Sequence, residues 1–178
     1  MADNLKTAKT GTLSSVLCRV AGGQGLHINA LDVYDGRTMI DSGIVVQTIL
    51  KAERDQKNLD RWLSDENPAT PDCLVDMYEL ESEAPFYRMF TEISGDLDKV
   101  VLSKTQILRF CELYPQYLCT EHTDNVRTLF LIKEDGDFTV VGIKADKDKK
   151  LSSFFVEFKH EILLTCPAQN VQLVAPRQ

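Results

Sequence analysis

The stretch RTLFLIKEDGDFTVVGIKA, residues Arg127 to Ala145, holds two runs of apolar and β-branched residues on either side of a charged turn. The turn contains Asp135-Gly136, a dipeptide typical of the tight loops that join antiparallel strands. A third run of the same kind, SSFFVEF at residues 152–158, follows the charged loop at residues 144–150. The pattern therefore predicts a β-hairpin that a third strand extends into an antiparallel meander.

Other segments also have the pattern of strands. Residues 73–80 alternate between apolar and polar side chains, as a half-buried strand does. Two short apolar segments follow the meander at residues 161–165 and 171–175, with Pro167 between them. We expect these two to add strands to the C-terminal sheet.

Two helices are expected between residue 80 and the meander. Ser82 is placed to cap the first helix and Gly95 to end it. The apolar residues of this helix recur at helical spacing, at Phe86, Met89, Phe90 and Ile93. Ser103 and Gln106 form a capping box at the start of the second helix, which must end before Pro115.

The N-terminal third contains the glycine-rich segment AGGQG at residues 21–25, between two short apolar runs. Its glycines permit positive φ, so the segment predicts a β-hairpin in which the chain reverses and Gln24 lies exposed at the tip. Residues 41–50 fit either a second hairpin or a helix, and periodicity does not decide between them. Residues 51–66 are rich in good helix formers and predict a third helix, which the following Asn-Pro pair ends.

These elements together predict an α+β fold: an N-terminal β-hairpin region, about three central helices, and a C-terminal antiparallel β-meander packed on helices. Residues 1–12 are expected to form a flexible N-terminus, because they are polar. Residues 13–66 would form the hairpin plus helix region, and residues 72–178 the helices followed by the meander. The two parts could form one continuous domain.

The composition excludes several classes of partner. The chain has 178 residues, a net charge of −7 and 43% hydrophobic residues, so it can bury a core but would repel a phosphate backbone. We therefore expect no nucleic-acid partner. No long apolar run or leader-like segment is visible, so we expect no membrane contact and no export. The five cysteines include no C-x-x-C pair, which fits reduced thiols in the cytoplasm.

The glycine-rich segment also has a possible catalytic interpretation. The relevant residues are Arg19, Gly22, Gly23, Gln24, Ile28, Asn29, residues 42–46 and residues 56–58. This set resembles the class I peptide-chain release factors, whose Gly-Gly-Gln motif hydrolyses peptidyl-tRNA. The resemblance implies a hydrolase with Gln24 as the catalytic residue. The chain lacks the Ser-Gly that precedes the family motif and has two residues inserted after Gln24, so we favour the turn.

Cysteine and histidine residues offer two further candidate sites. Cys111, Cys119 and His122 are close enough in sequence to supply three zinc ligands, although Cys111 also fits the apolar stripe of a helix. Any of His27, His122 and His160 could meet a cysteine and form a thiol-enzyme pair. Structural thiols are the favoured interpretation, and we expect neither a metal nor a cofactor.

We expect a cytoplasmic, non-enzymatic protein-interaction or regulatory module. Such a module would bind a protein partner, or associate with itself as a homodimer, through an edge of its sheet. Residues 127–133 and 154–158 are candidates for an exposed apolar patch. The alternatives are a hydrolase that uses the Gln24 loop, or a Cys/His thiol or zinc site.

Overall fold

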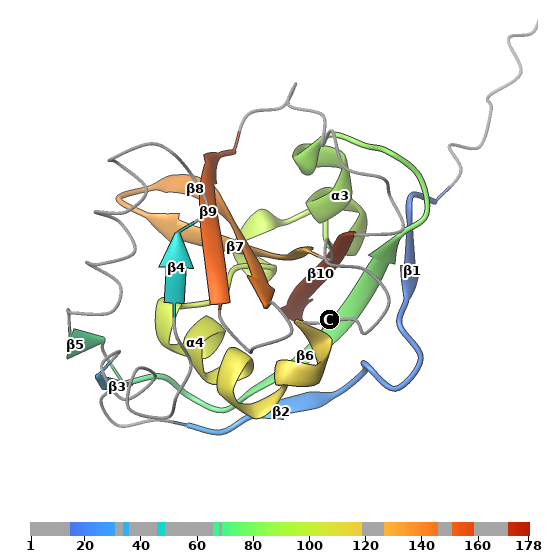
Figure 1. Cartoon of the computed structure of the whole chain (residues 1–178). Coiled ribbons are helices and arrows are strands. Elements are labelled where there is room, and N and C mark those ends of the chain that lie inside the picture. Colours follow the sequence, from blue (N-terminus) through green and yellow to red (C-terminus); the bar gives the residue numbers. More distant parts are fainter. Residues whose placement is uncertain are drawn as a thin grey trace, which may run out of the picture.

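The computed structural model describes residues 15–30, 34–35, 46–48, 66–67, 69–118, 127–145, 151–158 and 171–178. Eight of the described strands form one mixed sheet, in the order β1-β6-β10-β7-β8-β9-β4, and β2 pairs with β6 beside β1 (Figure 1). The strands of this sheet are β1 Leu17–Arg19, β2 Leu26–Ile28, β4 Val46–Thr48, β6 Cys73–Leu80, β7 Arg127–Glu134, β8 Asp137–Ala145, β9 Leu151–Glu157 and β10 Val171–Pro176. The short strands β3 Tyr34–Asp35 and β5 Glu66–Asn67 pair with each other.

The predicted hairpin is confirmed. Strands β7 and β8 pair antiparallel from Thr128 opposite Ile143 to Glu134 opposite Asp137. The connecting residues Asp135 and Gly136 have φ of 51° and 91°, as a two-residue hairpin turn requires. Strand β9 then pairs antiparallel with β8.

The predicted fold class is wrong. The described residues form mostly sheet, with two α-helices in place of about three, and the C-terminal strands are not a meander packed on a block of helices. Strand β10 lies between β6 and β7, antiparallel to β6 and parallel to β7. The error arose because local pattern identifies a strand but carries no information about its neighbour in the sheet.

The predicted N-terminal hairpin is also wrong. Strand β1 pairs antiparallel with the end of β6, and β2 pairs antiparallel with its beginning. The chain therefore runs in the same direction before and after the glycine-rich segment, which interrupts one edge strand and does not reverse it. Glycines suit both arrangements, because each needs residues with positive φ.

The two α-helices are α3 Phe86–Ile93 and α4 Lys104–Leu113, and single 3-10 turns follow at η1 Leu97–Lys99 and η2 Pro115–Tyr117. The capping box of Ser103 and Gln106 is confirmed at the start of α4. The predicted cap of α3 by Ser82 is wrong, because Pro85 is the N-cap and makes no side-chain cap. Neither helix of the described ranges is long and apolar enough to cross a membrane.

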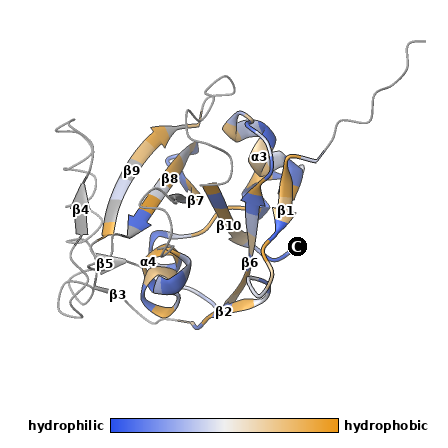
Figure 2. Ribbon diagram, turned by 45° about the vertical axis from the view of Figure 1, so that its right-hand side comes forward, coloured by the Kyte–Doolittle hydropathy of each residue, from blue (hydrophilic) through white to orange (hydrophobic). Residues whose placement is uncertain are grey.

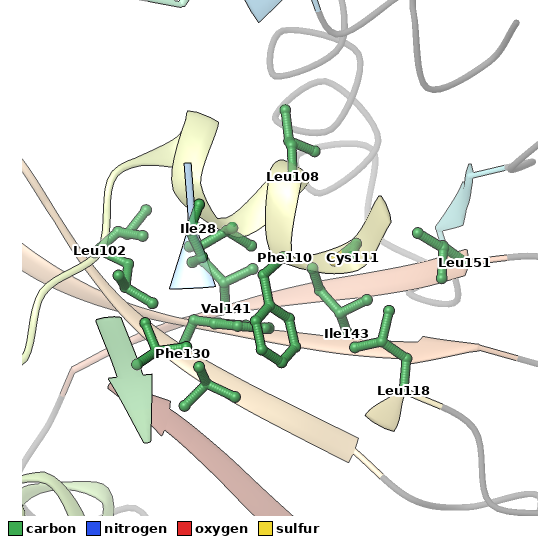
Figure 3. Close-up of a cluster of buried hydrophobic side chains, with 14 of the residues drawn as sticks. Ile28, Leu102, Leu108, Phe110, Cys111, Leu118, Phe130, Val141, Ile143 and Leu151 are labelled. Carbon is green, nitrogen blue, oxygen red and sulfur yellow. The ribbon is translucent and has the colours of Figure 1, made fainter. Parts of the chain in front are cut away.

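The two helices cover opposite faces of the sheet. Alternate residues of the central strands face α4 on one side, as Phe130 and Ile132 do, and α3 on the other, as Leu129 and Leu131 do. Figure 3 shows Phe110 and Cys111 of α4 directed into the first of these clusters, among side chains from the neighbouring strands. Figure 2 shows α3 beside β1 and β6, at one end of the sheet.

One further prediction is wrong at the described positions, and three others concern residues that the structure does not describe. Residues 46–48 form β4, which pairs parallel with β9, so the helix alternative for residues 41–50 is wrong at these positions. The predicted N-terminus 1–12, most of the predicted helix 51–66 and the predicted strand 161–165 lie outside the described residues.

Replacing Gly136 with alanine should lower the free energy of unfolding by about 1 kcal/mol, because an L-residue is disfavoured at a φ of 91°. Gly95→Ala is the matched control, since its φ is not positive and an added Cβ meets nothing within 4 Å. The control should change stability by less than about 0.5 kcal/mol. Urea denaturation of both variants measures the difference, and equal losses would contradict the turn assignment.

Candidate functional site

The glycine-rich segment forms a β-turn inserted into the edge of the sheet. The N–H of Val20 donates to Met77 O at 3.0 Å, and the N–H of Met77 donates to Gly23 O at 2.7 Å. The Gly23 N–H donates to Val20 O at 3.0 Å, which closes the β-turn, and Gly22 within the turn has a φ of 78°. A Cβ on Gly23 would lie 2.9 Å from the Met77 Cβ, so this position needs glycine. Both ends of the turn are thus held by one residue of β6.

Side chains hold the outer part of this loop. The Tyr117 hydroxyl donates to Gly22 O at 2.9 Å. The Gln24 side-chain amide donates to Val20 O, within the loop itself. The N–H of Gly25 donates to Asp76 Oδ1 at 2.7 Å. A backbone donor that a phosphate-binding loop would present to its ligand is therefore used by an internal carboxylate.

Asp76 is fully buried in β6 and has two arginines beside it. Its Oδ2 lies 3.7 Å from Arg19 Nη2 and 3.9 Å from Arg177 Nε. Both distances exceed a direct hydrogen bond, and among the described residues Oδ2 has no hydrogen-bond donor. The guanidinium groups are about half exposed, at 54% for Arg19 and 50% for Arg177. The three side chains form an ion cluster with a buried negative centre and two exposed positive ends.

A hollow of about 320 Å³ lies next to this cluster, between β1, β6 and α3, and we call it the α3 hollow. It is lined by Ser15, Leu17, Arg19, Tyr78, Glu92 and Ile93. Leu17 and Arg19 share one face of β1, Ser15 comes two residues before that strand, and Tyr78 lies opposite Arg19 on β6. The Arg19 guanidinium lies 6.0 Å from the centre of the Tyr78 ring.

Glu92 fixes the α3 side of the hollow by binding the start of β1. Its carboxylate accepts hydrogen bonds from the Val16 N–H at 3.0 Å, the Leu17 N–H at 3.1 Å and the Ser15 hydroxyl. Burial raises the pKa of Glu92, but these hydrogen bonds and the positive charge of Arg88 outweigh it, so its pKa is lowered. The carboxylate therefore stays ionised and holds α3 against β1.

The outer edge of β1 and β2 is partly closed by side chains. Val20 N–H donates to Met77 O of β6, and Val16 O accepts the N–H of Glu81 directly after β6, so the backbone groups of Leu17 face away from the sheet. The Leu17 N–H donates to Glu92, and Ser15 Oγ lies 2.8 Å from the Leu17 carbonyl oxygen while its one proton is donated to Glu92. On β2 the carbonyl of His27 accepts the Tyr114 hydroxyl at 2.8 Å. A docking strand would have to displace these contacts.

The candidate zinc ligands are only partly described. Cys111 is fully buried in the core beneath α4, and burial raises the pKa of its thiol, which disfavours the thiolate that a metal needs. Cys119 and His122 lie outside the described residues. Within the described ranges no cluster of three or more metal-binding side chains occurs. The zinc site as a whole stays a prediction.

The histidines of the thiol alternative and the glutamine of the release-factor alternative are only partly described by the structure. His27 lies opposite Leu74, so it faces away from the neighbouring Cys73, and its Nε2 is 3.5 Å from Asp72 Oδ2. His160 lies outside the described residues. Gln24 is exposed on the loop. Its catalytic role, implied by the release-factor resemblance, stays a prediction.

Sequence reasoning missed the residues of the ion cluster and of the α3 hollow. Arg19 and Glu92 meet the rest of the site across more than fifty residues, so no local spacing connects them. The one available signal was Asp76, a charged residue between Val75 and Met77 in an apolar strand. On a half-buried strand that position is ordinarily solvent-exposed, and alternation alone does not distinguish it from a buried charge.

The comparisons with known proteins assign neither a family nor a function to this chain. No protein-family model matches the chain, and no significant match is found among curated proteins or among solved structures.

Replacing Asp76 should destabilise the fold to a degree that depends on the new side chain. Asp76→Asn removes the two ion pairs but keeps an acceptor for Gly25 N–H, and should cost about 1 kcal/mol because both arginines remain hydrated. Asp76→Ala also leaves the Gly25 donor without its acceptor and should cost about 3 kcal/mol. Urea denaturation measures both losses. Equal losses would contradict the role of the Gly25 hydrogen bond.

Glu92 should make stability depend on pH. Its pKa in the folded chain is lowered from the ordinary value of 4.5, so its contribution is fully present above that value and is lost as the pH falls through the folded pKa. Thermal unfolding from pH 7 to pH 3 should show Glu92→Gln less stable than the original chain at pH 7, with the gap closing in acid. Glu83→Gln, on an exposed carboxylate before α3, is the control and should show no such gap.

Proposed function

We propose that this chain is a non-enzymatic protein-interaction module and that it holds a side chain of its partner in the α3 hollow. One observation carries the proposal: side chains from two strands and a helix converge on one depression of about 320 Å³. This volume is at the small end of ligand sites, which span roughly 300–1,000 Å³.

The exposure of the rim favours a protein partner over a small enclosed ligand. Ser15, Arg19 and Glu92 are exposed, whereas Leu17 and Tyr78 at the floor are buried. Pockets for small molecules ordinarily bury most of the ligand surface. An open depression with a polar rim and an apolar floor instead suits a side chain that protrudes from another protein.

The hollow is also a better contact site than the neighbouring sheet edge. Strand addition needs free backbone donors and acceptors, but the Leu17 N–H and the His27 carbonyl are engaged by side chains of this chain. The glycine-rich turn further interrupts the edge between β1 and β2. Self-association as a homodimer and a cytoplasmic location stay predictions.

The proposal is tested by filling the hollow. Ile93 lines it and is half-buried on α3, so Ile93→Trp should occupy the space that a partner side chain needs. Gly95→Trp is the matched control, because it places the same side chain two residues further on, where a Cβ meets nothing within 4 Å. Affinity capture from cells that express the protein should yield a partner with the original chain and with Gly95→Trp, and about tenfold less with Ile93→Trp.

The control measurement is the thermal unfolding of all three proteins, which should agree within a few degrees. A partner captured equally by all three would place the contact elsewhere, and failure of the original chain to capture any protein would contradict the proposal. If the captured partner is a second copy of the chain, the predicted self-association is confirmed at the hollow.

A further inference from the structure

We infer that the α3 hollow recognises a carboxylate carried on an aliphatic group, with Arg19 as its anchor. The inference rests on the proposed function, since it names the chemical group that a partner would insert there. The geometry assigns the carboxylate to the Arg19 end of the hollow and the aliphatic carbons to its floor.

Arg19 has hydrogen-bond donors to offer a ligand. Its guanidinium carries five N–H donors, and the ion pair with Asp76 spans 3.7 Å, which is longer than a direct hydrogen bond. The side chain is 54% exposed, so a ligand can reach it from solvent. A planar guanidinium binds a carboxylate through two parallel hydrogen bonds, which an ammonium group cannot match.

Tyr78 supplies a second polar group beside the first. It is buried at the floor of the hollow with Arg19 over its ring. Burial raises the pKa of Tyr78, although the charge of Arg19 and a hydrogen bond with it partly oppose this, so the phenol stays neutral and adds no negative charge beside Arg19. Leu17 and Ile93 provide the apolar surface that aliphatic carbons of the ligand would cover.

The acidic groups nearby leave the Arg19 end positive. Asp76 lies between Arg19 and Arg177, so one buried negative charge is shared by two guanidinium groups and the cluster has a net charge of +1. Glu92 at the other end of the hollow already accepts hydrogen bonds from Ser15, Val16 and Leu17. The chain's overall charge of −7 acts mainly at long range, where salt screens it over about 8 Å.

The inference is tested with three probes of nearly equal shape: 4-methylpentanoate, its neutral amide, and 3-methylbutylamine. Titration of each into the full chain, followed by two-dimensional amide NMR, should show the carboxylate binding about tenfold more tightly than the amide. The resonances that shift should be those of residues 15–19, 78 and 92–93. The amine should bind no more tightly than the amide.

Two variants separate recognition by Arg19 from its structural contact with Asp76. Arg19→Gln should lose the preference for the carboxylate over the amide. Arg177→Gln is the matched control, because Arg177 makes the same kind of ion pair with Asp76 at similar exposure but does not line the hollow. It lowers the net charge of the cluster but leaves the donors of Arg19 in place, so it should keep most of the preference, and its NMR spectrum reports whether the fold is intact.

A further arm distinguishes the sources of the carboxylate. N-acetyl-Gly-Gly-Leu with a free C-terminus should bind at least as tightly as 4-methylpentanoate, and the same peptide as its C-terminal amide should bind about tenfold more weakly. Binding of the small acid without binding of the peptide would overturn the partner-protein version of the inference.

Other results would overturn the inference as a whole. The inference fails if the original chain does not bind the carboxylate, or if the amine binds more tightly than the carboxylate. It also fails if Arg19→Gln and Arg177→Gln lose the carboxylate preference equally. If Ile93→Trp still abolishes capture of a partner while the carboxylate preference is missing, the proposed function stands and only this inference fails.

Discussion

The buried carboxylate of Asp76 joins three parts of the chain that lie far apart in sequence, which are residues 19–25, β6 and Arg177. It accepts the N–H of Gly25 at 2.7 Å and has Arg19 and Arg177 on either side of its second oxygen. A buried carboxylate without such partners would destabilise the fold or take up a proton. The edge strand, the glycine-rich loop and the residue that follows β10 each supply a partner to Asp76 in β6. These contacts favour the observed arrangement of the three segments around β6.

The α3 hollow follows from the same arrangement. Asp76 and Tyr78 lie on the face of β6 that α3 covers, and Glu92 on α3 binds the start of β1. The helix is thereby held against the edge strand at Ser15 and Leu17 while the Arg19 end stays open to solvent. The pairing of Arg19 with a buried carboxylate restricts where its guanidinium can lie. A partner group would thus meet a partly ordered cation, which lowers the entropy cost of binding.

Features that neighbouring residues decide are the ones that the sequence predicts. The hairpin at Asp135-Gly136 and the capping box of Ser103 and Gln106 were predicted, because each is decided by residues within one turn of chain. The glycine-rich segment was predicted as a hairpin, yet it lies within one interrupted edge strand. Its glycines reported the need for positive φ at Gly22 and Gly25 but not the direction of the chain that follows. The place of β10 between β6 and β7 was missed because strand order depends on contacts between remote segments.

The residues of the candidate site also divide into those that the sequence predicts and those that only the fold brings together. The sequence by itself determined the apolar strands, the cap of α4 and the positions where glycine is needed, since these depend on propensities and hydrogen bonds within a few residues. Only the tertiary structure decided that Arg19, Asp76 and Arg177 meet, that Glu92 binds the start of β1, and that a hollow opens between them. The physical reason is that burial and charge pairing depend on distance in space, and the burial of Asp76 exists only once the sheet has formed.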